Sequence, residues 1–576
     1  MTNKISWIIF GAITVFLFIF LQFFVRIKPA GDMVEYYGIT ETLINHLGLD
    51  LTDVDKKSLE RQLNPGQFND PNYYIEGIDG KKYPGHFILY SILATPVRVV
   101  LKTLNLDQLK TLVFTNLIIL TFTVFYILKN FLKSGFKRIV FLSLIYLSPL
   151  ISFIIWPGPD LFYVCFLMLS VFLFFKKSYF SASFLSAIAS WHSQPLIVIS
   201  LFYLLYYIAV NFITSDTEKK YFKFMQKVFF QCLLILIMLS VPYIYNLAVI
   251  GVLTPWTIFH EGWTTVYGFG LHNLSLKKLF EQFFDLNMGL FFYAPLILLA
   301  GIYFMFKSVI FDKKIYLLLV VLIATAFMYQ TNPSWHFGTA GYGPTRHILF
   351  VMPFLIYFLL EYFQKGKKQN IILGAIIISQ IFVLGVNGFI YPDFENSLKN
   401  TPYAKFVLEK FPSLYNPTPE IFVDRTNHTD LKIPSTAMYK IGNKCIKAYV
   451  LVHDVENVSK ECGWIPEKYL AKLYNPYLKK TSTSRQVWTI EATFWPDSES
   501  CEERFTQSVN KPYICLKTID EVIKYTGIID RGRIGLVENY LYPGIWRMRR
   551  GVPVLISIPA GYIVNHYSFE GVYVDF

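Results

Sequence analysis

The chain has 576 residues, of which 54% are hydrophobic and only 16% charged, and its formal net charge is +13. Soluble domains carry about 25% charged residues, so this composition excludes a protein whose surface is mainly in contact with water. A basic soluble protein would suggest a nucleic-acid partner. Here the lysines and arginines gather in short clusters between apolar runs, as in the cytoplasmic loops of membrane proteins, so we expect no nucleic-acid partner.

Apolar runs close to the roughly 20 residues that cross a bilayer occur along most of the chain. The first, Ile5–Val25, is long and has no small-residue cleavage site, so we interpret it as an anchor and not as a signal peptide. The further runs are 86–104, 111–130, 137–156, 159–176, 179–192, 195–213, 228–250, 287–307, 315–332, 345–363 and 370–390. We therefore predict an α-helical polytopic membrane module over residues 1–390.

Charge then orients the runs. Cytoplasmic loops concentrate lysine and arginine, and five clusters fit this pattern: Lys129/Lys133/Lys137/Arg138, Lys176/Lys177, Lys219/Lys220/Lys223/Lys227, Lys307/Lys313/Lys314 and Lys365/Lys367/Lys368. All five lie inside only if one run does not cross. The best candidate is 86–104, which contains Pro96, Arg98 and Lys102, and we expect it to form a juxtamembrane helix or re-entrant hairpin on the outer face. About eleven transmembrane helices remain, with residues 26–110 as the first outer loop.

The polar part of the chain, residues 391–576, is predicted to be an extracytoplasmic α+β or mostly β domain, because strand-like stretches occur at 486–494 and 552–558. An extracytoplasmic location permits disulfides. Pairing of sequence neighbours would join Cys445 to Cys462 and Cys501 to Cys515, but four cysteines allow three pairings.

Polar residues that could carry chemistry open and close the first outer loop. Asp32 and Glu35 directly follow the first span, where a carboxylate could act as a general base on a lipid-linked substrate; a Gly-Asp pair is equally a helix N-cap signal. Lys81, Lys82 and His86 close the loop. They could hold a phosphate, or the lysines could be a solvated pair at the interface.

Two later outer segments carry further candidates. Asp160 begins an apolar run, where an acid is costly unless it faces a cavity, although a helix N-terminus also favours it. Trp335 and His336 open a glycine-rich segment that ends in Arg346, at a depth where an arginine suits a phosphate or a lipid headgroup. No zinc signature, Walker loop or G-x-S-x-G motif occurs, so we predict no metal site and disfavour ATP-driven transport and serine hydrolysis.

Five short motifs in the predicted outer segments together resemble the GT-C superfamily of membrane glycosyltransferases, in particular the protein mannosyltransferases, the aminoarabinose transferases and the RgtA/B/C/D-like proteins. The resemblance covers roughly residues 5–365. The motifs are Gly31-Asp32-x-x-Glu35-Tyr36, Tyr83-Pro84-Gly85-His86, Pro159-Asp160, Asp285-x-x-Met288-Gly289-Leu290-x-x-Tyr293-Ala294-Pro295, and Trp335-x-x-Gly338 leading to Gly343-Pro344-x-Arg346.

The resemblance implies inverting transfer of a sugar from a polyprenyl-phosphate carrier to an extracytoplasmic glycan, lipid or protein, in a plasma or inner membrane. Asp32 would be the catalytic base, and Asp160 would line the same site. Glu35 comes three residues after Asp32 instead of next to it, so which of the two has the supporting role stays open. The substrate and its phosphate would be held by members of a set comprising Lys81, Lys82, His86, Arg346, Trp335 and His336. The resemblance leaves a divalent cation open. The alternatives are a transporter or flippase for a lipid-linked saccharide, and a non-catalytic assembly protein.

Overall fold

A computed structural model gives the structure of the chain, which divides into two compact units: Met1–Thr257 with Gly270–Ser397, and Ile258–Phe269 with Leu398–Phe576. The structure describes residues 2–27, 32–63, 74–213, 218–251, 253–254, 271–310, 312–332, 335–336, 342–363, 366–387, 394–429, 436–450, 455–463, 493–494, 513–516, 554–557 and 572–575.

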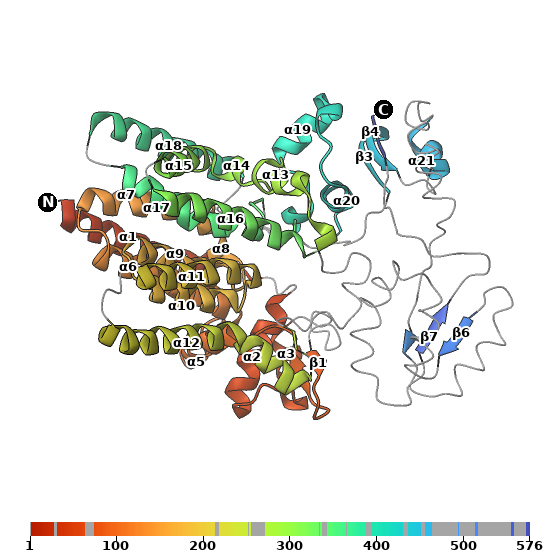
Figure 1. Cartoon of the computed structure of the whole chain (residues 1–576). Coiled ribbons are helices and arrows are strands. Elements are labelled where there is room, and N and C mark those ends of the chain that lie inside the picture. Colours follow the sequence, from red (N-terminus) through yellow and green to blue (C-terminus); the bar gives the residue numbers. More distant parts are fainter. Residues whose placement is uncertain are drawn as a thin grey trace. The chain divides into compact units, whose positions relative to one another are not determined.

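The first unit is helical, and within the described ranges six of its helices are long and apolar enough to cross a membrane (Figure 1). They are α1 (Thr2–Phe23), α6 (Thr111–Asn130), α11 (Ile197–Ile213), α12 (Glu218–Ile250), α16 (Lys313–Gln330) and α18 (Lys367–Val386). Many of their apolar side chains are exposed, as expected where lipid and not water is the neighbour. This confirms the helical, membrane-type architecture, whereas the expected count of about eleven spans stays a prediction.

The predicted span 137–156 is broken. It forms α7 (Gly135–Tyr146) and a second segment over Pro149–Ile155, with a bend of 60° between them. Pro149 explains the break, because proline lacks an N–H donor and disfavours helical geometry in the residue before it. The Ser148 side chain instead accepts a hydrogen bond from the Leu150 N–H and starts the new segment.

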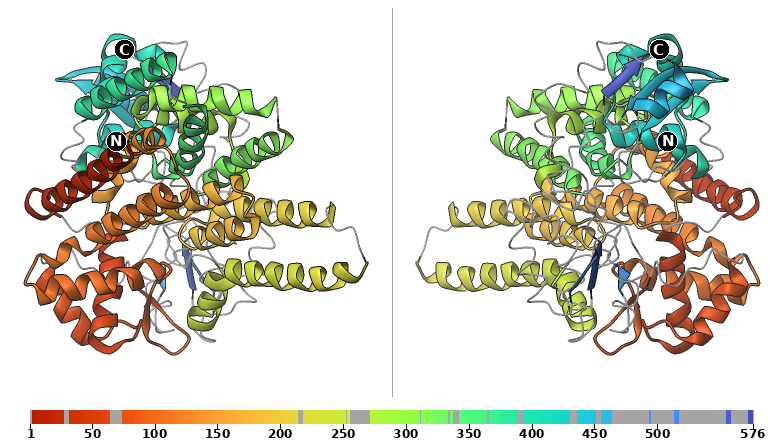
Figure 2. Two further views of the ribbon diagram at one scale, coloured as in Figure 1. Left: turned by 90° about the vertical axis from the view of Figure 1, so that its left-hand side faces the viewer. Right: turned by 90° about the vertical axis from the view of Figure 1, so that its right-hand side faces the viewer.

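Shorter helices make up the interior of the unit. α9 (Asp160–Phe175) is almost entirely buried and packs against α6, α10 (Tyr179–Ser190) and α17 (Met352–Tyr362). α15 (Pro295–Val309) packs on α17, and α11 lies beside α12 (Figure 2). Further short elements of this unit are η1 (Gln108–Lys110), η2 (Pro149–Ile151), α8 (Ser152–Ile155), η3 (Gln194–Leu196), η5 (Leu271–Asn273), α13 (Leu276–Phe284), α14 (Leu290–Tyr293), η6 (Arg346–Val351) and η7 (Phe394–Leu398).

The run expected not to cross forms α5 (Leu89–Thr103), which contains Pro96 and is not among the candidate spans. Arg98 on this helix is fully buried. α5 packs against α2 (Asp32–His46), and Arg98 donates a hydrogen bond to the Tyr37 carbonyl, so this polar residue is used in a contact within the first loop. The side of the membrane on which it lies is still a prediction.

The rest of the first loop holds α2 in place. α3 (Asp53–Gln62) starts with a capping box between Thr52 and Asp55 and packs on α2. The strands β1 (Tyr74–Glu76) and β2 (Lys82–Pro84) form an antiparallel hairpin in which Tyr74 pairs with Pro84. The hairpin brings His86, two residues after its end, to the first turn of α2, where its backbone N–H donates to Glu35.

The second unit is mixed α and β. Its helices are α19 (Pro402–Lys410), η8 (Pro412–Leu414), α20 (Pro419–Asn427) and α21 (Val455–Cys462). Its strands are β3 (Ala437–Ile441), β4 (Lys444–Val450), β5 (Thr493–Phe494), β6 (Tyr513–Leu516), β7 (Val554–Ser557) and β8 (Val572–Asp575). They form two antiparallel three-stranded sheets, ordered β3-β4-β8 and β5-β7-β6.

Two predictions for this unit can be compared with the structure. The disulfide between Cys445 and Cys462 is present, whereas Cys501 lies outside the described residues, so its pairing stays a prediction. The strand expected over 552–558 is confirmed as β7. Of the strand expected over 486–494, only the end is described, as β5.

Candidate functional site

Two carboxylates from the first turn of α2 form the start of the candidate site. Acidic side chains are stabilised at a helix N-terminus by the helix dipole, and both Asp32 and Glu35 lie there. Their environments differ: the Asp32 side chain is 42% exposed, whereas that of Glu35 is 1% exposed. One acid is therefore accessible to a substrate, and the other is enclosed.

Glu35 is bound on both oxygens by His86. The His86 backbone N–H donates to Oε1 at 2.6 Å, and ring Nδ1 lies 2.6 Å from Oε2. The second ring nitrogen, Nε2, lies 3.9 Å from Oδ2 of Asp32. Burial by itself lowers the pKa of His86, but the carboxylates of Glu35 and Asp32 outweigh it and raise the pKa above its ordinary value. His86 therefore tends to carry a positive charge beside Asp32.

Arg346 approaches Asp32 from another part of the sequence, with Nη1 3.5 Å from Oδ2. Two hydrogen bonds hold this segment of the backbone there. The Thr345 N–H donates to the Met288 carbonyl at 3.0 Å, and the Tyr163 hydroxyl donates to the Arg346 carbonyl at 2.7 Å. An arginine that would be costly in an apolar setting is thus fixed next to an acid.

Asp160 is a second acid around Arg346. It is the first residue of α9 and is buried, and its charged neighbours are Arg346 and Asp32. Arg346 therefore interacts with one exposed and one buried carboxylate, which satisfies its charge without closing off Asp32.

Aromatic side chains frame these charges. The buried Tyr36 ring lies 5.2 Å from the His86 ring and 5.5 Å from Tyr90. His192 accepts the Tyr90 N–H on Nε2 at 3.1 Å. Burial, and secondly the charge of His86, lower the pKa of His192 to about 3, so this histidine is neutral and structural. Tyr163 was missed from the sequence, although its spacing of three residues from Asp160 on one helix was a usable signal.

The remaining predicted site residues are placed differently. Lys81 is exposed and forms an ion pair with Asp50 at 3.1 Å, and Lys82 lies in β2. Trp335 and His336 are buried, and the Trp335 carbonyl accepts the Thr345 hydroxyl at 3.2 Å, so Trp335 supports the residue next to Arg346. Their assignment to substrate binding stays a prediction. Gly31 and Gly338 of the motifs lie outside the described residues.

A metal site was not expected, and across the described ranges no group of three or more His, Cys, Asp or Glu side chains is arranged to hold a metal ion.

Comparison of the chain with protein-family models, with curated proteins and with solved structures found no match. The function is therefore inferred from two features of the chain. One is the motif resemblance, and the other is the group of charged side chains near the start of α2, formed by Asp32, Glu35, His86, Asp160 and Arg346.

Proposed function

We propose that the chain is an integral membrane glycosyltransferase that moves a sugar from a polyprenyl-phosphate carrier to an extracytoplasmic glycan, lipid or protein, with inversion at the anomeric carbon. One observation carries the proposal. A half-exposed carboxylate, Asp32, has a guanidinium at 3.5 Å and an imidazole at 3.9 Å, in a chain with several helices suited to a bilayer. A base and groups that bind phosphate are thus available at one place.

Asp32 would act as the general base. An ordinary aspartate is ionised at neutral pH and can accept a proton without special activation. It accepts the proton of an acceptor hydroxyl, whose oxygen attacks the anomeric carbon. The bond between that carbon and the phosphate oxygen breaks, and the polyprenyl phosphate leaves with the electron pair. Arg346 and His86 stabilise the negative charge that develops on this phosphate.

The geometry favours Asp32 over Glu35 for this step. Both oxygens of Glu35 are occupied by His86 at 2.6 Å. Charge-assisted hydrogen bonds are typically about 2.7–2.9 Å long, so the separations of 3.5 and 3.9 Å around Asp32 are loose. A substrate can compete for these contacts. In this proposal Glu35 supports His86, and Asp160 supports Arg346.

A lipid carrier fits the setting better than a nucleotide sugar. The exposed apolar faces of α1, α12 and α18 are suited to a bilayer, where a polyprenyl chain is soluble. If residues 391–576 and the first loop are extracytoplasmic, nucleotide sugars are scarce on that side. The remaining finer features, about eleven spans and a plasma- or inner-membrane location, belong to the same proposal.

The test is transfer by the full-length protein in proteoliposomes supplied with polyprenyl-phosphate carriers labelled in the sugar. Asp32→Asn should lower the rate by at least a hundredfold, within the about 10²–10⁴ range of general-base contributions. Asp53→Asn is the matched control, because Asp53 is almost fully exposed on α3 and its ion-pair partner is Lys56, which is not a residue of the proposed site. Undiminished transfer by Asp32→Asn would refute the assignment. Movement of the labelled lipid across the bilayer without transfer would favour a flippase.

A further inference from the structure

The short helix α13 exposes apolar side chains on one side and buries polar ones on the other. Its apolar residues are Leu276, Leu279, Phe280, Phe283 and Phe284, which share one face by their spacing. In a soluble protein such a face would turn towards the core. Here Leu279 and Phe283 pack on the core, but Leu276 is 77% and Phe280 61% exposed. The two polar residues that follow Phe280, Glu281 and Gln282, are buried instead.

The buried polar side of α13 is fastened to the end of α16, a candidate membrane span. The Ser275 N–H donates to Gln330 Oε1 at 2.8 Å, and Gln282 Nε2 donates to the Ala326 carbonyl at 3.4 Å. Just before the helix, Asn273 Nδ2 donates to the Thr331 carbonyl at 3.2 Å. Since α16 ends at Gln330, these bonds hold α13 at the level where the span ends.

α13 packs against α16, whose own apolar side chains are exposed. Leu317, Val320 and Ile323 of α16 are exposed apolar residues along a helix that is suited to lipid. Lys277, next to Leu276, is half-exposed and lies 3.8 Å from Glu281. Lys278 instead lies over the Trp335 ring, at 5.5 Å from its centroid. An apolar face bordered by lysine, at the end of a span, is typical of a helix in the membrane interface.

We propose that α13 lies in the plane of the bilayer interface, with Leu276 and Phe280 among the acyl chains of phospholipids. The partner of this surface is the bilayer itself. The inference does not depend on the glycosyltransferase assignment, since it concerns only where this helix sits. It would hold equally for a transporter.

The full-length protein is placed in vesicles of phosphatidylcholine and phosphatidylglycerol that contain a phospholipid with a photoactivatable diazirine in its acyl chain. Adducts are mapped by mass spectrometry after irradiation. We expect labelling of Leu276 and Phe280 within about threefold of that on Val320 and Ile323. Val54 is the matched control, because it is 67% exposed on the charged helix α3 and should be labelled at least tenfold less.

Labelling of α13 at the level of Val54, with α16 labelled, would overturn the proposal. Absence of labelling on α16 as well would also overturn it, because the span that positions α13 would then not contact lipid. Both outcomes differ from failure of the proposed function, which is read from sugar transfer by Asp32→Asn and not from lipid labelling.

Discussion

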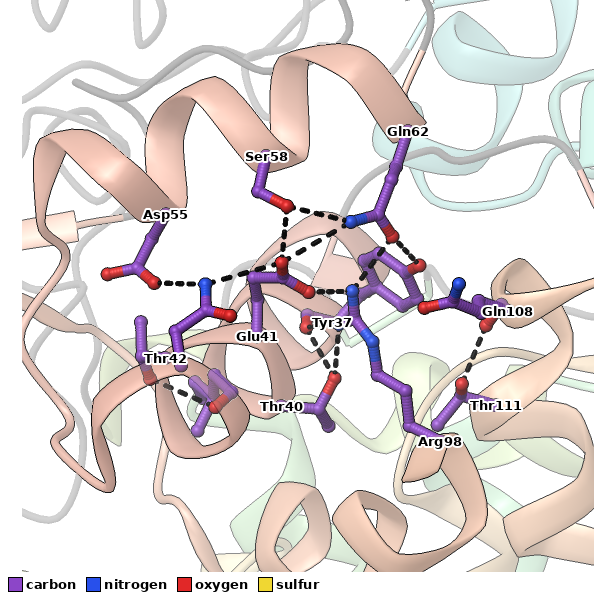
Figure 3. A network of polar contacts seen from close by, with 12 residues as sticks. Tyr37, Thr40, Glu41, Thr42, Asp55, Ser58, Gln62, Arg98, Gln108 and Thr111 are labelled. Carbon is purple, nitrogen blue, oxygen red and sulfur yellow. Dashed lines mark hydrogen bonds and ion pairs between the residues drawn. The ribbon is translucent and has the colours of Figure 1, made fainter. Parts of the chain in front are cut away.

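Replacing Arg98 with methionine should loosen the first loop, because it leaves a buried carboxylate without its cation. Arg98 and Glu41 form a buried ion pair between α5 and α2 (Figure 3). The guanidinium also donates to the Thr40 hydroxyl at 2.6 Å and to Gln62 Oε1 at 2.8 Å, so it joins α5 to α3 as well. Glu41 in turn accepts a hydrogen bond from Ser58 at 2.5 Å.

The expected loss of stability in Arg98→Met follows from the burial of this ion pair. Removing one partner of a buried ion pair typically costs about 3–5 kcal/mol, because the other charge stays desolvated. At about 1.4 kcal/mol per tenfold change, this corresponds to roughly a hundredfold to several-thousandfold increase in local opening. Adding Glu41→Gln to Arg98→Met should restore much of the loss, since the amide oxygen can still accept from Ser58 and no charge remains buried.

Amide hydrogen exchange of α3 and α5 in the full-length protein measures this opening. The matched control is Glu361→Gln, which removes an exposed ion pair with Lys137 at 3.3 Å and should change protection by less than about 1 kcal/mol. Wild-type exchange rates in Arg98→Met would refute the reasoning. Equal loss in the single and double variants would show that packing, and not the unpaired charge, sets the stability.

Three further predictions concern pH and backbone space. Glu35→Gln should lower the raised pKa of His86. In the proposed mechanism protonated His86 assists the leaving phosphate, so the loss of activity with rising pH should occur at lower pH in the variant than in the wild type, and an unshifted pH–rate profile would contradict this. Burial raises the pKa of Asp55, but its hydrogen bonds outweigh this and lower the pKa in the folded state. The protection of α3 against hydrogen exchange should therefore fall as the pH drops below about 4 and through this lowered pKa. Asp55→Asn should remove this pH dependence. Gly289→Ala should lower thermal stability and transfer, since a Cβ there would lie 2.4 Å from a backbone nitrogen, whereas Gly374→Ala, with nothing within 4 Å, should be tolerated in the same melting assay.

The apolar runs were predictable because bilayer thickness sets a length that sequence alone reveals. The predicted run 111–130 coincides with α6, and 370–390 overlaps α18 (Lys367–Val386). The break at Pro149 was harder to see, because the residues on both sides are apolar and hide the interruption. Short buried helices such as α9 also carry the apolar signal without the length of a span.

The sequence predicted residues that belong to the candidate site, but not which of them contact one another. The sequence offered Lys81 and His86 as equivalent cations, yet the β1–β2 hairpin pairs Lys81 with Asp50 and places His86 on Glu35. Such partners depend on tertiary contacts that local spacing does not encode. The roles proposed for Asp32 and Glu35 likewise rest on their different exposure, which the sequence of one helical turn does not reveal.

α2 is held at two points by residues that follow it in the sequence, and this sets an order for its folding during biogenesis. His86 binds the first turn of α2 and Arg98 binds its middle, so α2 cannot reach its final geometry until residue 98 has been synthesised. Arg346 arrives after most of the membrane helices of the first unit. A partly inserted chain therefore presents Asp32 without its guanidinium, and in the proposed mechanism it cannot stabilise a departing phosphate. Sugar transfer, if the proposal holds, would therefore begin only after the membrane module is almost completely inserted, because Arg346 lies near its end.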